Sequence, residues 1–223
     1  MSSRILILTV AHGASHRRAA NALRKALLGI RPELNAEVVD GLAQCASWFR
    51  LYYNSYLIPL KLWPSLWGRI ESAQHNSAST GPGWLYRRGG QPLFRFVERA
   101  GPDTVIATEV GMCELAALHK RRSGARYRLV AAPTGIDADR AWVQPEVDLY
   151  VAGPGEPTER LIATGAPPER ILSCGTPIDP VFETLPEREA VRGRLEVDNA
   201  VPLVLILFGG AGIGNPGQIV PEL

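Results

Sequence analysis

Two histidines stand close together near the N-terminus, in the segment TVAHGASHRRAANAL that spans residues 9–23. His12 and His16 flank a run of small residues, and the residues after His16 have helical spacing. A histidine at the start of a helix lies at the positive end of the helix dipole, which disfavours the imidazolium form. A neutral imidazole there can accept a proton, so His16 is a candidate general base. The alternative is a surface histidine beside a loop, with no part in chemistry.

A glycine-rich segment, GGAGIGNPG, follows an apolar run near the other end of the chain, at residues 209–217. Gly212, Gly214 and Gly217 have the G-x-G-x-x-G spacing of a phosphate-binding loop. Pro216 interrupts that spacing, and only six residues follow Gly217, so no complete dinucleotide-binding unit can follow. We therefore interpret the segment as a glycine loop that opens a second domain.

Residues 47–70, SWFRLYYNSYLIPLKLWPSLWGRI, mix aromatic and basic side chains without a single acid. One interpretation is a long amphipathic helix buried against the domain. The other is a surface that enters lipid headgroups, where tryptophan and tyrosine prefer to lie and cations meet anionic lipid. The absence of acids between Asp40 and Glu71 favours the membrane surface. Aromatic and arginine side chains could also stack on the bases of a nucleic acid. No recognised nucleic-acid motif supports that alternative, so nucleic acid is not expected as a partner. The expected membrane-contact residues are Trp48, Arg50, Lys61, Trp63 and Trp67.

Charge is distributed unevenly along the 223 residues, although the formal net charge is only +2. Residues 1–100 contain 13 basic and 5 acidic side chains, and residues 101–223 contain 11 basic and 17 acidic ones. This asymmetry predicts an anionic partner for the first half, either a nucleic acid or a membrane surface. The three cysteines are far apart in the sequence, which favours reduced thiols in a cytoplasmic protein and predicts no metal site.

Short apolar runs alternate with segments of helical spacing along the chain. The apolar runs predict strands at 5–10, 36–40, 104–108, 128–133, 148–152, 170–175 and 201–208. Helical spacing predicts helices at 16–29, 113–122, near 155–164 and at 187–197. Such alternation predicts an α/β fold with a parallel sheet flanked by helices.

Several of these segments together resemble the diacylglycerol glycosyltransferases, the family of monogalactosyldiacylglycerol synthases and processive diacylglycerol glucosyltransferases. The matching segments are ILILTVAHGASHRRAANAL, PDTVIAT, AWVQPEVDLYV, ERLIATGAPPERILSCGTPIDPVF and the glycine loop after VLILF. The resemblance implies the N-terminal, Rossmann-like half of a glycosyltransferase B architecture. Residues 1–180 would form the lipid-acceptor domain, and residues 181–223 would begin a truncated nucleotide-sugar domain.

The resemblance also implies roles for individual residues. His16 would take the proton of the diacylglycerol hydroxyl during an inverting transfer of a hexose. Gly13, Ser15 and Trp142 would contact the substrate, while Gly209 and Gly210 would contact the donor, a nucleotide-sugar such as a UDP-hexose. His12, Glu109 and Asp137 are the next candidates for the base. No separate cofactor is expected.

The expected activity is hexose transfer to diacylglycerol by a cytoplasmic protein that is peripheral on the inner face of the membrane and contacts anionic lipid. Because only six residues follow the glycine loop, we expect the 223-residue chain to be inactive alone. Two alternatives stay open at this point: a non-catalytic membrane-binding acceptor module, and a domain for a polyprenyl-linked acceptor of the peptidoglycan type.

Overall fold

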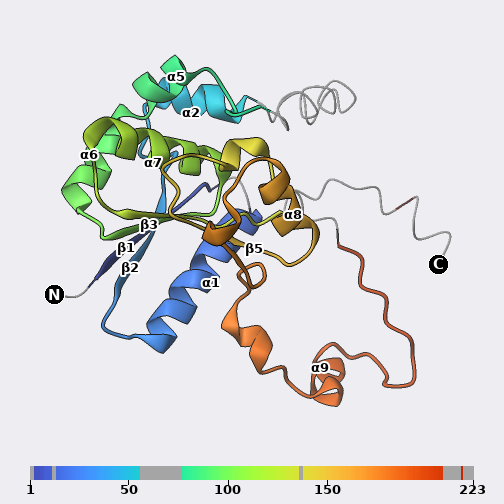
Figure 1. The fold of residues 1–223 in the computed structure, drawn as a ribbon. Coiled ribbons are helices and arrows are strands. Elements are labelled where there is room, and N and C mark those ends of the chain that lie inside the picture. Colours follow the sequence, from blue (N-terminus) through green and yellow to red (C-terminus); the bar gives the residue numbers. More distant parts are fainter. Residues whose placement is uncertain (1–2, 12–13, 56–76, 136–137, 208–216, 218–223) are drawn as a thin grey trace.

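A six-stranded parallel sheet forms the centre of the protein in the computed structural model, which describes residues 3–11, 14–55, 77–135, 138–207 and 217. The strands are β1 (Arg4–Thr9), β2 (Asn35–Asp40), β3 (Thr104–Ala107), β4 (Arg128–Ala131), β5 (Leu149–Ala152) and β6 (Ile171–Ser173). Their spatial order is β2-β1-β3-β4-β5-β6, and every neighbouring pair is parallel. The predicted α/β fold with a parallel sheet flanked by helices is therefore confirmed (Figure 1).

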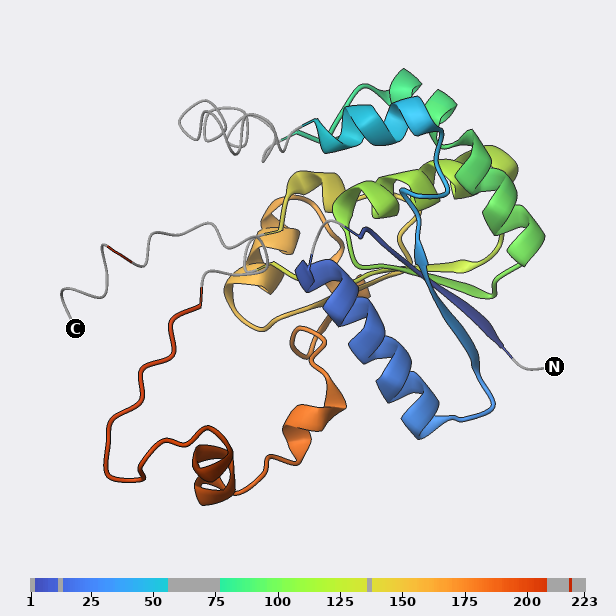
Figure 2. The same cartoon turned by 180° about the vertical axis from the view of Figure 1, so that it is seen from behind.

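Helices cover both faces of this sheet (Figures 1 and 2). The described helices are α1 (Ala14–Ile30), α2 (Ser47–Asn54), α5 (Gly83–Gly89), α6 (Gln91–Ala100), α7 (Val110–Ser123), α8 (Glu156–Ala163) and α9 (Arg188–Arg194). Of these, α1 packs on β1 and β2, α7 packs on β1, β3 and β4, and α9 lies away from the sheet. Three 3₁₀ turns accompany them: η1 (Arg140–Trp142), η2 (Pro168–Arg170) and η3 (Pro180–Glu183). None of the helices in the described ranges combines the length and the apolar character needed to cross a bilayer.

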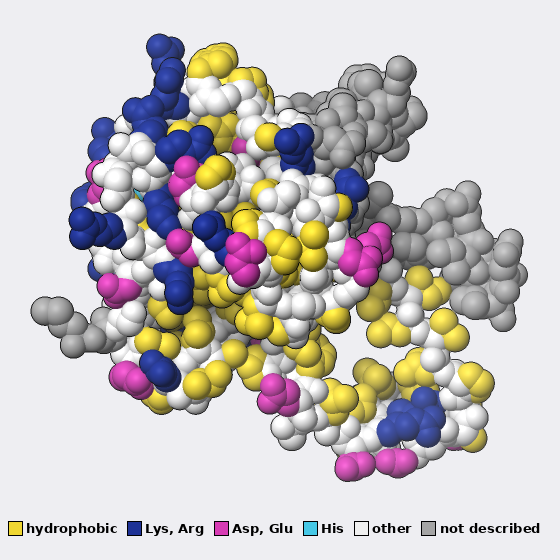
Figure 3. Space-filling view, in the orientation of Figure 1, with side chains coloured by type: hydrophobic (Ala, Val, Ile, Leu, Met, Phe, Trp, Pro, Cys, Tyr) yellow, Lys and Arg dark blue, Asp and Glu magenta, His cyan; other side chains and the backbone are white. Residues whose placement is uncertain are grey.

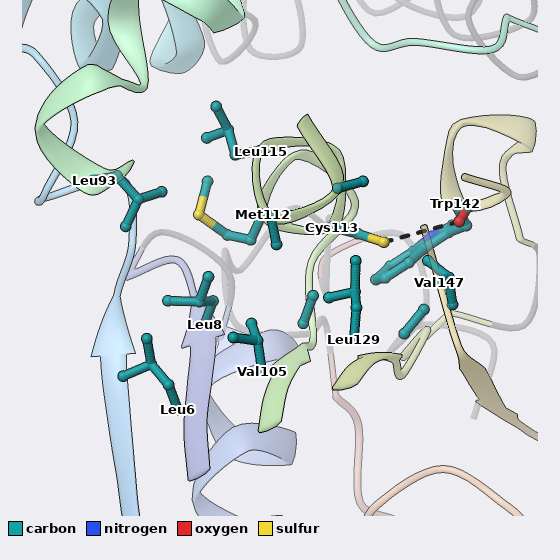
Figure 4. Close-up of a cluster of buried hydrophobic side chains, with 14 of the residues drawn as sticks. Leu6, Leu8, Leu93, Val105, Met112, Cys113, Leu115, Leu129, Trp142 and Val147 are labelled. Atoms are coloured by element: carbon teal, nitrogen blue, oxygen red, sulfur yellow. Dashed lines mark hydrogen bonds between the residues drawn. The ribbon is translucent and has the colours of Figure 1, made fainter. Parts of the chain in front are cut away.

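Alternation along β1 explains why the sheet is covered on both faces. Ile5 and Ile7 pack in the cluster that α1 covers, to which Leu23 and Leu27 of that helix contribute. The alternate positions of β1, Leu6 and Leu8, pack in the larger cluster beneath α7, together with Met112 and Leu115 (Figure 4). Residues that alternate along a strand point to opposite faces of the sheet, so an uninterrupted apolar strand requires a helix on each side.

A second helical layer, formed by α2 and α5, lies over α7 (Figure 1). Phe49 of α2 is fully buried, and its ring meets the ring of Tyr86 edge-on at a centroid distance of 5.3 Å. The layer comes close because glycines stand at its contacts: a Cβ atom on Gly89 would lie 2.2 Å from Cγ of Phe49. On α7, a Cβ on Gly111 would lie 2.1 Å from the hydroxyl oxygen of Tyr53.

Two expectations about elements differ from the structure. Helices α5 and α6 were not predicted, although Leu93, Phe94 and Val97 of α6 have the spacing of a buried helical face. The predicted strand at 201–208 is wrong over its described residues, 201–207, which have no strand pairing. An apolar run becomes a strand only beside a strand with which it can exchange hydrogen bonds, and none of the six strands is its neighbour. The domain boundary at residue 180 stays a prediction.

We predict that Gly89→Ala lowers the free energy of unfolding by about 1–3 kcal/mol, because the new methyl group overlaps the root of the Phe49 side chain. Gly29→Ala in α1 is the matched control, since nothing lies within 4 Å of the added Cβ. It should raise the free energy of unfolding by roughly 0.5–1 kcal/mol through helix propensity. Urea unfolding of both variants tests this, and equal effects would contradict the close approach of α2 and α5.

Candidate active site

The start of α1 and the loops after β3 and β4 meet at the carboxyl edge of the sheet, which is the edge where open α/β folds bind ligands. In the spatial order of the strands, β1 lies beside β3 and β3 lies beside β4. Parallel pairing places Leu8 opposite Ala107, and Ala107 opposite Ala131, so the residues after these strands emerge side by side. His16 follows β1, Thr108 follows β3, and Thr134 follows β4.

His16 is held by the loops after β3 and β4. Its Nδ1 lies 2.8 Å from the carbonyl oxygen of Thr108 and 2.9 Å from Oγ1 of Thr134. The Thr108 hydroxyl in turn donates to the carbonyl oxygen of His16 at 3.1 Å. A carbonyl oxygen can only accept, so Nδ1 carries the hydrogen in this arrangement. These contacts fix the ring against two strands that are about a hundred residues away in sequence.

This tautomer decides what His16 can do. With the hydrogen on Nδ1, the neutral imidazole has a free lone pair on Nε2. No residue in the described part of the chain forms a hydrogen bond with that nitrogen, and the side chain is half-buried. An oriented imidazole with an accessible, unprotonated nitrogen has the chemistry of a general base.

Glu109, a candidate base next to Thr108, has a different role. Its side chain is 6% exposed, and its Oε2 caps α7 by accepting from the backbone N–H of Met112 at 3.0 Å. The hydroxyl of Tyr53 donates to Oε1 at 2.7 Å. Burial, followed by the charge of Glu109, raises the pKa of Tyr53 well above its usual value, so the phenol keeps its proton. Both carboxylate oxygens of Glu109 therefore anchor helices.

A second buried carboxylate, Glu114, lies five residues further along α7 and is also 6% exposed. It accepts from the Ser79 hydroxyl at 2.5 Å, and from the backbone N–H and hydroxyl of Thr80 at 2.9 and 2.6 Å. The Thr80 hydroxyl also bonds to that of Tyr86 in α5. Glu114 lines a cavity of about 330 Å³. Burial raises its pKa from 4.5 to about 7, although the hydrogen bonds from Ser79 and Thr80 act in the opposite direction.

The two described substrate-contact residues expected from the sequence, Ser15 and Trp142, differ in their exposure to solvent. Ser15 is exposed in the first turn of α1, which begins one residue earlier, and its hydroxyl has no hydrogen-bond partner among the described residues. Trp142 is only 5% exposed and packs against Leu129 and Val147 in the core (Figure 4). Its carbonyl oxygen accepts from Sγ of Cys113 at 3.8 Å. Direct contact of Trp142 with a substrate stays a prediction.

Other predicted positions lie outside the described residues: His12, Gly13, Asp137, Gly209, Gly210, Lys61, Trp63 and Trp67. The two membrane-contact residues that the structure does describe are on α2, where Trp48 is 46% exposed and Arg50 is exposed. Across the described ranges, no group of three His, Cys, Asp or Glu side chains could hold a metal ion.

Sequence reasoning missed the two threonines that hold His16. Thr108 and Thr134 follow apolar strands, so their place at the carboxyl edge could be inferred. Their contacts with His16 could not be inferred from the sequence, because the strand order that brings the three residues together is a tertiary feature.

The sequence that forms this edge of the sheet matches a known protein family. The model described as monogalactosyldiacylglycerol (MGDG) synthase matches residues 16–178. The chain belongs to the monogalactosyldiacylglycerol synthase family. The match begins at His16 and includes every strand of the sheet except β1. The family resemblance inferred from the sequence is therefore confirmed, and the protein is of a glycosyltransferase family.

Two solved structures are similar to the chain at low sequence identity. The lipopolysaccharide outer core galactosyltransferase WaaB in its apo form has 14% sequence identity and a TM-score of 0.45, over 76% of this chain and 44% of that one. MurG of Acinetobacter baumannii has 10% identity and a TM-score of 0.45, over 84% of this chain and 47% of that one. The MGDG synthase-family chain thus spans less than half the length of these two structures. No curated protein matches its sequence.

We predict that the stability of the protein falls as pH rises from about 4.5 to about 7, in part because of Glu114. A carboxyl whose pKa is raised on folding binds its proton more tightly in the folded state, so stability is full below 4.5 and lost through the folded pKa. Glu114→Gln removes this loss. The free energy of unfolding of the variant, minus that of the unsubstituted protein, should therefore be higher at pH 8 than at pH 5 by on the order of 3 kcal/mol.

Urea unfolding at both pH values checks this, with exposed Glu189→Gln as the control. Comparing each variant with the unsubstituted protein at the same pH cancels the titration of the histidines. A pH dependence that Glu114→Gln leaves unchanged would assign the effect to another group.

Proposed function

We propose that the protein provides the acceptor side of a glycosyltransferase that moves a hexose from a UDP-sugar to diacylglycerol at a membrane surface, with inversion. The observation that carries the proposal is the orientation of His16, whose Nδ1–H is bound to Thr108 and whose Nε2 is free to accept a proton. The family match supports the acceptor and donor classes.

The proposed reaction is a direct displacement. Nε2 of His16 takes the proton of the diacylglycerol hydroxyl as the hydroxyl oxygen attacks the anomeric carbon of the sugar. The bond from that carbon to the diphosphate oxygen breaks, and UDP leaves with the electron pair. Attack from the side opposite the leaving group inverts the anomeric configuration. A positioned base is needed because an alcohol is a weak nucleophile at neutral pH.

The side chains around His16 support its role as base. The imidazolium formed by proton transfer would keep its Nδ1–H bond to the Thr108 carbonyl, whose partial negative charge stabilises it. Thr134 limits rotation of the ring from the opposite loop. Glu109, with both oxygens engaged, is less suited to this role. The donor would be held by a second domain, to which Gly209 and Gly210 are expected to contribute.

The membrane part of the proposal rests on the aromatic face, defined here as Trp48, Leu51, Tyr52 and Trp84. These side chains on α2 and α5 are 46%, 76%, 38% and 55% exposed. Neither helix contains an acid, and Arg50, Arg87 and Arg88 are exposed beside the face. Figure 3 shows hydrophobic and basic side chains together at this end of the molecule. Aromatic anchors combined with cations suit the headgroup region of an anionic bilayer.

Buried polar contacts between the α2–α5 layer and α7 hold the aromatic face in place. Tyr53 of α2 is bound to Glu109, and Tyr86 of α5 is linked through Thr80 to Glu114. Because Glu109 caps α7 and Glu114 lies on it, and because the cap follows Thr108 directly, the face is fixed relative to His16. A lipid bound at the aromatic face would thus have a defined position relative to the base.

For His16 we predict a large loss of turnover in the protein joined to the donor domain of an MGDG synthase-family relative. His16→Ala should lower kcat by roughly 10²–10⁴-fold, the usual contribution of a general base. Thr134→Val should lower kcat less, with KM unchanged, because it frees the ring without removing the base. The measurement is transfer of labelled hexose from UDP-hexoses to diacylglycerol in vesicles.

The controls separate the ways in which this proposal can fail. Absence of transfer with every UDP-hexose, despite intact vesicle binding, would favour a non-catalytic membrane-binding module. Transfer to a polyprenyl-linked acceptor in place of diacylglycerol would change the acceptor class. Transfer that persists in His16→Ala would mean that the base lies elsewhere.

For the aromatic face we predict salt-sensitive flotation with anionic vesicles and weaker flotation with neutral ones. Replacing Trp48 and Trp84 together by Ser should lower the fraction bound to anionic vesicles by about tenfold at limiting lipid, a change of about 1.4 kcal/mol. Ile30→Ser, which changes a side chain that is 78% exposed at the end of α1, is the matched control. Equal flotation of the two variants would show that α2 and α5 do not contact the membrane.

A further inference from the structure

A groove lies between α1 and the segment 177–182. Figure 2 shows this segment running beside the helix. The volume of the groove is about 680 Å³, within the range of roughly 300–1,000 Å³ typical of pockets for small molecules. One wall is polar and the other is apolar. The polar wall consists of Arg18, Asn21, Arg24 and Lys25, and the other wall of Pro177, Ile178, Asp179, Val181 and Phe182.

The polar wall is strongly cationic. Helix α1 contains four basic side chains and no acid. The one acid among the lining residues is Asp179, which is paired with Lys25, and this pairing lowers the pKa of Asp179. Nε of Arg24 donates to the carbonyl oxygen of Ala36 at 3.0 Å. Arg18 is exposed and has no hydrogen-bond or ion-pair partner in the described ranges, so the groove has an excess positive charge.

The apolar wall exposes large side chains that are held in place. Ile178, Val181 and Phe182 are 67%, 63% and 62% exposed. Asp179 caps the η3 turn by accepting from the backbone N–H of Val181 at 3.1 Å, while its other oxygen binds Lys25. One carboxylate therefore fixes the turn and also attaches it to α1. An exposed apolar wall fixed beside unpaired positive charge matches a ligand with an apolar part and an anionic part.

We propose that this groove binds one molecule of an anionic amphiphile. The anionic head, a phosphate or a carboxylate, lies against Arg18 and Asn21, and the hydrocarbon chain lies along Ile178, Val181 and Phe182. A nucleotide fits less well, because the apolar wall offers few groups that could read the edge of a base. The inference does not depend on the proposed sugar transfer, since none of these residues contacts His16 or belongs to the aromatic face.

Calorimetry below the critical micelle concentration tests the ligand class, with a lysophosphatidic acid as the probe. A monoacylglycerol with the same chain lacks the charge, glycerol 3-phosphate lacks the chain, and UDP supplies a nucleotide phosphate. The lysophosphatidic acid should bind with a Kd at least about tenfold lower than any of the three. Equal binding of glycerol 3-phosphate or UDP would identify a simple phosphate or nucleotide site. Equal binding of the monoacylglycerol would show that the basic side chains do not contribute to binding. Each of these results overturns the proposal.

Paired variants test the location. Arg18→Gln and Phe182→Ser should each raise the Kd for the lysophosphatidic acid by about tenfold. Arg17→Gln, next to Arg18 on the same helix, and Leu185→Ser, just beyond the groove, should leave it unchanged. The variant of Trp48 and Trp84 should also leave it unchanged, which separates this site from the aromatic face. If the lining variants behave like the controls, the groove is not the binding site.

Discussion

Parallel pairing of β1 with β3, and of β3 with β4, is the constraint on which the candidate site depends. It brings Thr108 and Thr134 to the imidazole of His16, so that the start of α1 and two loops distant in sequence form one hydrogen-bonded unit. Because the Thr108 carbonyl can only accept, the same contact that anchors the ring also selects its tautomer. Backbone geometry thus places the hydrogen on Nδ1 and leaves Nε2 as an acceptor, with no charged partner of the ring among the described residues.

Two buried carboxylates, one at the start of α7 and one within it, organise the other part of the molecule. Glu109 caps that helix and binds Tyr53, and Glu114 binds the segment that leads into α5. Buried charges need several hydrogen bonds to be tolerated, and here those bonds connect the α2–α5 layer to α7. The polar contacts that satisfy the carboxylates also define where the aromatic face lies. The basic groove on α1 and the aromatic face on α2 and α5 are separate surfaces, on opposite sides of the sheet.

Much of the fold could be predicted from local pattern, because apolar strands and amphipathic helices of sufficient length determine their own type. The strands β1 to β6 and helices α1, α7 and α8 correspond to predicted segments. The one predicted strand that did not form lacked, in the described part of the chain, a neighbouring strand with which to exchange hydrogen bonds. The run VPLVLIL at 201–207 has the composition of a strand but no neighbouring strand among the described residues, and its side chains are largely exposed.

The sequence by itself determined the parallel α/β class, which rests on residue type and on spacing along the chain, and the family, which rests on similarity to known sequences. It also supplied His16 as a candidate base, and that role stays a prediction. Only the tertiary structure decided which nitrogen of His16 is free, because that depends on Thr108 and Thr134, which lie far away in sequence. It also placed Trp142 in the core and gave Glu109 to helix anchoring, because burial and hydrogen-bond partners come from packing between elements. Residue type sets what a side chain can do, and its neighbours in space decide which of those roles it takes.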